Sequence, residues 1–222
     1  MKKCTLAAVA LALALAPGGT TGAPATSSDP SFTPTVDHRY FPLVPGRLCV
    51  YEGEEDGLPV TEEVRTLEVP RVIAGVACTA LEERRIVGGV FVDLTTEWFA
   101  QDAQGNVWKF GEESFESDRG LFVRSDDSWF AGSDGARPWM TLAALPRVGE
   151  RYFGYRPNGI DVLRIGSLSE TVAVPAGTFV GCIEVFENPD DPEDRDIILY
   201  APGLGMVSET SESGFVRLVS VR

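Results

Sequence analysis

EWFAQDAQGNVWKFGE, residues 97–112, places large apolar side chains on both sides of a short polar centre. The centre, residues 102–106, contains Gly105 and Asn106, two residue types that accept the positive φ angles of tight turns. The flanking residues include Trp98, Phe99 and Phe110, which supply large area for packing on a sheet face. The stretch therefore predicts two antiparallel strands joined by a tight turn.

Short segments of strand-forming residues, separated by turns, continue through most of the chain. The middle predicts one further hairpin over 122–130, and 139–145 is the only stretch that predicts a helical turn. No segment has the length, caps and 3.6-residue period of a long helix. The sequence thus predicts an all-β, mainly antiparallel fold with little helix, built as a sandwich or as a strongly curved half-barrel.

Four landmarks occur twice in the same order, about a hundred residues apart. The shared order predicts an internal duplication, with related halves at about 37–113 and 147–222 joined by a loop-rich segment, 114–146. Generic hairpins with similar turns are the alternative. The landmark pairs are Tyr51 and Tyr155, Cys78 and Cys182, Ala100 and Ala201, and Val107 and Val207.

The first 25 residues have the pattern of a secretory signal peptide. Lys2 and Lys3 precede the apolar run 6–16, which is too short to span a bilayer, and Ala23-Pro24-Ala25 fits a cleavage site. We expect cleavage near Ala25 and a flexible leader over 26–36, followed by one β domain over 37–222. The protein is then exported, to the periplasm or the exterior.

Loss of Lys2 and Lys3 with the signal leaves 17 basic against 33 acidic residues, a net charge of −16. A chain with this much negative charge repels phosphate backbones, so we expect no nucleic-acid partner. The remaining 197 residues contain no apolar run that predicts a transmembrane segment.

Three cysteines remain after cleavage: Cys49, Cys78 and Cys182. Export permits a disulfide, and the duplication makes Cys78–Cys182 the candidate bridge. Pairing through Cys49, or three free thiols, are the alternatives. No C-x-x-C spacing suggests zinc or redox chemistry.

Aromatic residues are concentrated between positions 98 and 139. They form either the core or closure between the two halves, or they line a cleft for an apolar or sugar ligand. The candidate ligand-binding residues are Trp98, Trp108, Phe110, Trp129 and Trp139.

Five acidic residues in the loop 188–196 form a candidate calcium site: Asp190, Asp191, Glu193, Asp194 and Asp196. Proline content and like-charge repulsion favour an exposed loop instead. The spacing of Asp102, Gln104, Asn106 and Glu113 also approaches a calcium loop. Val107, however, stands where the sharp turn needs glycine, so the hairpin is the better interpretation.

Catalysis has little support in the residue pattern. Gly132-Ser133-Asp134-Gly135 approaches a nucleophile elbow, but Pro138 ends any following helix, and the chain has one histidine, His38. No ordinary triad is available. We expect a protein that is not an enzyme and has no cofactor other than calcium.

Several motifs together resemble an uncharacterised family of exported bacterial β-rich proteins. They are YFPLxPG (40–46), YEG (51–53), EWFAQDxxGNVWxFGE (97–112), AGxDGA (131–136) and YAPGxG (200–205). The resemblance implies export and β structure, but no catalytic residues. More distantly, V-P-x-G…C and Y-A-x-G-x-G are similar to half-barrel envelope proteins of the lipoprotein-carrier type, which hold acyl chains, although the helices that cap those half-barrels are not predicted here.

These observations predict an exported, non-catalytic binding protein of the cell envelope or exterior. Its ligand is apolar or a sugar, or its partner is an envelope protein. Two alternatives remain: a carrier-like binder of acyl chains, and a calcium-assisted surface or adhesion module.

Overall fold

The computed structural model describes residues 31–157, 159–192 and 194–222. The signal peptide and residues 26–30 of the expected leader lie outside these ranges. All regular elements in the described ranges are β-strands, and they contain no helix long and apolar enough to cross a membrane. The prediction of an all-β fold is confirmed.

Two antiparallel meanders form the main sheet. The first comprises β4 (Leu48–Glu55), β5 (Leu58–Thr66), β7 (Val76–Val87), β8 (Val90–Asp102), β9 (Val107–Asp118) and β10 (Leu121–Arg124). The second comprises β13 (Arg151–Arg156), β14 (Gly159–Val174), β15 (Gly177–Glu187), β16 (Asp196–Ala201), β17 (Gly205–Thr210) and β18 (Gly214–Val221). Their order in the sheet is β10-β9-β8-β7-β5-β4-β18-β17-β16-β15-β14-β13, so neighbours in sequence are neighbours in space.

The pairing of β4 with β18 joins the two meanders. Two glycines at this seam allow the backbones to approach. A Cβ atom on Gly53 would lie 1.7 Å from the Phe215 carbonyl oxygen, and one on Gly214 would lie 1.8 Å from the Glu54 carbonyl oxygen. Any larger residue at either position therefore pushes the strands apart.

Short strands cover the ends and faces of the main sheet. β1 (Phe32–Thr33) pairs with β8, β6 (Arg71–Ile73) pairs with β7, and both β11 (Trp129–Phe130) and β12 (Trp139–Leu142) pair with β9. β2 (Val36–His38) and β3 (Phe41–Leu43) form a separate hairpin.

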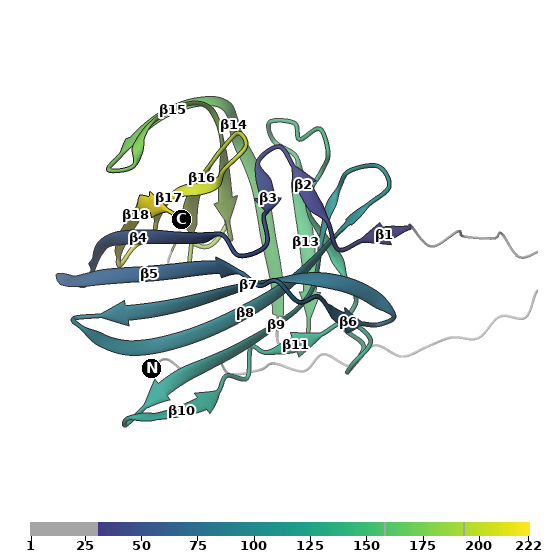
Figure 1. Cartoon of the computed structure of the whole chain (residues 1–222), viewed down its shortest axis with the longest axis horizontal. Coiled ribbons are helices and arrows are strands. Elements are labelled where there is room, and N and C mark those ends of the chain that lie inside the picture. The colour runs from purple at the N-terminus through teal and green to yellow at the C-terminus, as the bar shows by residue number, and fades with distance from the viewer. Residues whose placement is uncertain (1–30, 158, 193) are drawn as a thin grey trace, which may run out of the picture.

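The sheet curves strongly without closing into a barrel. Figure 1 shows β13 and β14 of the second half running steeply across the direction of β7 and β8 around a common interior. The two ends of the sheet approach each other through β12, because the Trp139 ring lies against Gly154 of β13. A Cβ atom on Gly154 would lie 2.3 Å from that ring. The fold is therefore a curved half-barrel with a concave side.

The hairpin predicted over 97–112 is confirmed as β8 and β9. Asp102 fixes its turn: one carboxylate oxygen accepts hydrogen bonds from the backbone N–H groups of Gln104 and Asn106, both at 2.9 Å. The other oxygen accepts from the Asn106 amide at 2.8 Å and from the Trp108 indole at 2.9 Å. Burial disfavours the charged carboxylate, but these bonds outweigh that effect and lower the pKa of Asp102.

Several predicted boundaries were wrong. Structure begins within the expected leader, since β1 pairs with β8 and Val36 is 2% exposed. The predicted hairpin over 122–130 does not exist, because β10 and β11 both pair with β9. The predicted helical turn at 139–145 contains strand β12. The segment 114–146 is therefore more ordered than predicted.

All four landmark pairs occupy matching strands of the two meanders, and the tyrosines lie on the first strand of each, Tyr51 on β4 and Tyr155 on β13. Cys78 lies on β7 and Cys182 on β15, Ala100 on β8 and Ala201 on β16, and Val107 on β9 and Val207 on β17. All six are fully buried. The tyrosines differ, because Tyr51 is 3% exposed and Tyr155 is 63% exposed. The duplication itself stays a prediction.

Candidate functional site

A cavity of about 280 Å³ lies on the concave side of the sheet and takes lining residues from both meanders. A smaller cavity of about 100 Å³ shares Phe41, Glu97, Glu187, Ile198 and Tyr200 with it, so the two form one concavity. We call the larger one the main cavity. Pockets of a few hundred cubic ångströms accommodate small ligands.

One part of the main cavity is apolar. Leu43 and Leu81 line it from the first half of the chain, and Leu204 and Met206 from the second. Phe41 on β3 packs over this part, with its ring 4.9 Å from Phe99 and 6.0 Å from Tyr200. The β2–β3 hairpin thus places an aromatic side chain against the mouth of the curved sheet, between the two meanders.

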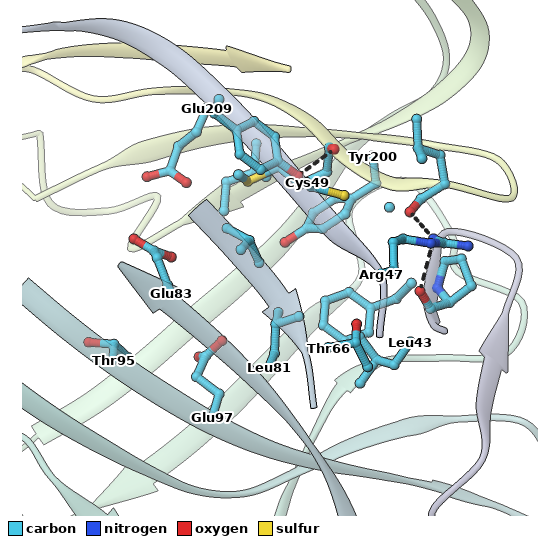
Figure 2. Close-up of a pocket in the computed structure, with 18 of the residues that line it drawn as sticks. Leu43, Arg47, Cys49, Thr66, Leu81, Glu83, Thr95, Glu97, Tyr200 and Glu209 are labelled. Carbon is cyan, nitrogen blue, oxygen red and sulfur yellow. Dashed lines mark hydrogen bonds between the residues drawn. The ribbon is translucent and has the colours of Figure 1, made fainter. Parts of the chain in front are cut away.

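Arg47 provides a positive charge on the same side. Its guanidinium donates to the carbonyl oxygen of Leu204 at 2.9 Å and, more weakly, to that of Pro42 at 3.4 Å. Figure 2 shows Leu43, Arg47 and Thr66 on one side of the main cavity, and Glu83, Glu97 and Glu209 on the other. The cavity is therefore polarised, with an apolar side and an acidic side.

Five glutamates line the acidic side: Glu83, Glu97, Glu112, Glu187 and Glu209. Two of them have a counter-charge, because the buried Lys109 ammonium lies 2.5 Å from a carboxylate oxygen of Glu97 and 2.5 Å from one of Glu112. Burial disfavours the Lys109 charge, but the two carboxylates overcome this and raise its pKa. Burial likewise opposes ionisation of Glu112, but Lys109 prevails and lowers the pKa of Glu112.

We call the other three the unpaired glutamates: Glu83, Glu187 and Glu209. None of the three makes a side-chain hydrogen bond or ion pair with a residue that the structure describes. Burial, followed by repulsion from Glu62 and Glu97, raises the pKa of Glu83 to about 8. Burial and repulsion from Glu83 raise the pKa of Glu209 to about 8, and burial raises that of Glu187 to about 7. At neutral pH Glu83 and Glu209 therefore hold protons that ordinary glutamates have lost, and Glu187 is partly protonated.

The candidate aromatic residues form core instead of lining the main cavity. Trp98, Phe110, Trp129 and Trp139 are all less than 8% exposed. Of the two cavities, Trp139 lines only the smaller one, and Trp108 is half-buried with its indole N–H bonded to Asp102. Trp108 and Trp139 also border a shallow outer depression beside Phe153 and Tyr155. Their role in ligand binding stays a prediction, and the core explanation fits their burial.

The acidic loop 188–196 has protein partners for two of its candidate ligands. Asp190 pairs with Arg151, and Asp194 accepts a hydrogen bond from the Asn188 amide at 2.8 Å. Glu193 lies outside the described residues. In the part of the chain that the structure describes, no cluster of three or more metal-ligating side chains is arranged to hold a metal ion. Calcium binding here stays a prediction.

Cys49, Cys78 and Cys182 are buried free thiols in the structure. The expected Cys78–Cys182 bridge is absent from it, because Cys78 packs in the cluster around Trp98 and Phe110, whereas Cys182 packs in a separate cluster around Tyr51 and Leu218. Matching positions in two meanders that lie side by side do not bring the two sulfur atoms together.

His38 is a structural residue in the observed fold. Its Nε2 lies 3.0 Å from the carbonyl oxygen of Ala143, and its Nδ1 accepts from the Tyr40 backbone N–H at 3.2 Å. Burial lowers its pKa. Ser133 lies in a turn in which the Ala136 N–H donates to the Ser133 carbonyl oxygen, and neither residue lines the main cavity.

Sequence reasoning missed the glutamates of the cavity. A usable signal existed: Leu81, Glu83 and Arg85 alternate along β7, as do Thr95, Glu97 and Phe99 along β8, and each set faces one side of its strand. Charged residues occur on both faces of β7, so alternation alone does not show which face of this strand lies on the concave side of the sheet.

The fold and the cavity define an all-β protein whose sheet curves around a polarised concavity. No family model matches the chain, and no curated protein matches it. Two solved structures are similar: a predicted exported protein with a YmcC-like fold from Bacteroides fragilis, and a predicted lipoprotein from Parabacteroides distasonis. They share 15% and 13% sequence identity with TM-scores of 0.38 and 0.35, and each alignment covers 83% of this chain and 99% of the other. Similarity of this degree assigns neither family nor function.

Proposed function

We propose that the protein is an exported, non-catalytic binding protein whose ligand occupies the main cavity. The observation that carries this proposal is the cavity of about 280 Å³, enclosed by side chains from both meanders and partly apolar. The signal-peptide pattern of residues 1–25 supports export. A non-catalytic role is supported by His38, the one histidine of the chain, which is used in the fold away from the cavity.

Filling the cavity tests the proposal. Leu204 lines the main cavity, so Leu204→Trp reduces its volume, whereas Val180 is 68% exposed and lies outside it. We expect the neutral fluorescent probe N-phenyl-1-naphthylamine to bind the mature wild-type protein and Val180→Trp equally, and Leu204→Trp at least about tenfold more weakly. Equal binding of the probe by both variants contradicts the proposal, and so does a wild-type protein that binds neither this probe nor any of the eight-carbon ligands named below.

A carrier of acyl chains is the second candidate. The apolar side and Arg47 favour it, because a guanidinium pairs with a fatty-acid carboxylate. The five glutamates of the opposite side act against an anionic head group. Binding of octanoate in preference to neutral octan-1-ol would support this candidate.

A further inference from the structure

We propose that the ligand of the main cavity is a cationic amphiphile, an apolar skeleton carrying an amine, whose ammonium group binds between Glu83, Glu187 and Glu209. This inference rests on the proposed function and specifies its ligand. The amine end lies at the acidic side, and the apolar skeleton packs against Leu43, Leu81 and Met206.

The three unpaired glutamates are the first reason. Glu83 and Glu187 are partly buried, and both line the main cavity, yet no described residue donates a hydrogen bond to their side chains or forms an ion pair with them. Most polar groups that are withdrawn from bulk water have hydrogen-bond partners within the fold. A ligand with several N–H donors and a positive charge supplies what these carboxyl groups lack.

The distribution of the nearby cations is the second reason. The Lys109 ammonium forms ion pairs with Glu97 and Glu112. Arg85 reaches from β7 toward Glu55 and Glu62 and pairs with both. Arg47 lies on the opposite, apolar side. Each protein cation near the cavity thus has partners of its own. Arg85 and Lys109 act on the unpaired glutamates only from a distance, without forming an ion pair with them.

The charge of a neighbouring hollow is the third reason. Glu209 also lines a neighbouring polar hollow of about 600 Å³, together with Asp194, Asp196 and Glu212. Arg85 and Arg195 are the basic residues of this hollow. An acidic hollow beside an acidic wall attracts cations and repels anions.

Protonation couples to such binding. Glu83 and Glu209, with pKa values of about 8, hold protons at neutral pH when no cation is bound beside them, and Glu187, with about 7, is partly protonated. An ammonium group stabilises the charged carboxylates and lowers their pKa values, so binding releases protons. The groups that face them and modulate this release are Glu62, Asp93, Glu97, Asp161 and Asp196, with Arg85 and Lys109 as cations.

Calorimetry with three ligands of equal chain length tests the inference: octylammonium, octan-1-ol and octanoate. We expect octylammonium to bind the wild-type protein at pH 8 at least about tenfold more tightly than octan-1-ol, as charge-assisted hydrogen bonds imply. Octylammonium affinity should decrease from pH 8.5 to pH 6, whereas octan-1-ol affinity should not. Titrations in two buffers of different ionisation enthalpy should show proton release with octylammonium only.

Variants localise the effect. Glu83→Gln and Glu209→Gln should weaken octylammonium binding about tenfold and leave octan-1-ol binding unchanged. Glu52→Gln, on the exposed face of β4, is the matched control and should change neither. Should a Gln variant fail to fold, the proton-release measurement on the wild type still decides.

The outcomes separate the two proposals. If octan-1-ol and the naphthyl probe bind, but octylammonium binds no more tightly than octan-1-ol, the inference is wrong and the proposed function stands. Preference for octanoate also overturns it and assigns the anchoring role to Arg47. If neither the neutral probe nor any of the three ligands binds, the proposed function fails together with the inference.

Discussion

The unpaired glutamates make the stability of the ligand-free protein depend on pH, and Glu83→Gln tests this. Burial and repulsion from Glu62 and Glu97 raise the pKa of Glu83 from 4.5 to about 8. A carboxyl group whose pKa is higher in the folded state contributes stability that is complete below its ordinary pKa. That contribution is lost as the pH rises through the folded-state value. The wild-type protein should therefore lose stability between about pH 4.5 and pH 8.

The magnitude follows from the shift. A carboxyl group protonated only in the folded state lowers the free energy of unfolding by about 1.4 kcal/mol per pH unit. The full shift of Glu83 sets an upper limit of about 5 kcal/mol by this relation. Water in the cavity screens part of the cost of ionising Glu83, and part of the shift belongs to the repulsion between Glu83 and Glu209 rather than to Glu83 alone. We therefore expect a contribution of about 2 kcal/mol from Glu83. Glutamine is neutral and almost isosteric, so Glu83→Gln removes this loss and also relieves Glu209.

Urea denaturation of the mature protein at half-unit intervals from pH 5 to pH 8.5 measures the effect. We expect wild-type and Glu83→Gln stabilities to be similar at pH 5 and to diverge by about 2 kcal/mol at pH 8.5, with the variant more stable. Glu52→Gln should follow the wild type throughout. Parallel curves for Glu83→Gln and wild type would refute the idea that Glu83 is protonated in the folded state.

Three further substitutions test how the fold is held together. Asp102→Ala removes four hydrogen bonds from the β8–β9 turn and should cost about 3 kcal/mol in thermal or urea unfolding, whereas Asp118→Ala, on the exposed end of β9, should cost almost nothing. Lys109→Met leaves two partly buried carboxylates, Glu97 and Glu112, without their cation. We expect the free energy of unfolding to fall by about 4 kcal/mol at pH 8 and by less at pH 5. A loss that does not depend on pH would contradict the ion-pair assignment. Gly53→Ala places a methyl group on the Phe215 carbonyl at the β4–β18 seam and should lower the free energy of unfolding by more than about 3 kcal/mol, while Gly159→Ala, which has open space, serves as control.

Local chemistry determined the strands and turns. Gly88 and Gly89 both adopt positive φ angles, which a two-residue hairpin between β7 and β8 requires, and the dipeptide is readable in the sequence. The same holds for Asp102, whose turn-forming side chain follows a strand of aromatic residues. Errors arose in the choice of strand partner: β10 pairs back onto β9 instead of forward with β11, and β11 and β12 pair with β9, which is not their neighbour in the chain. Short local patterns do not specify such partners.

The sequence by itself determined an all-β chain with a signal-peptide pattern, because period-two alternation, turn residues and the apolar N-terminal run are local features. Only the tertiary structure decided which side chains of each strand lie on the concave side of the sheet. A strand presents side chains to both sides, and the side that lines the cavity depends on how the sheet curves once β4 has paired with β18 and Trp139 has packed against Gly154. That curvature brings glutamates from β7, β15 and β17 to one place, although more than a hundred residues separate Glu83 from Glu209 in the chain.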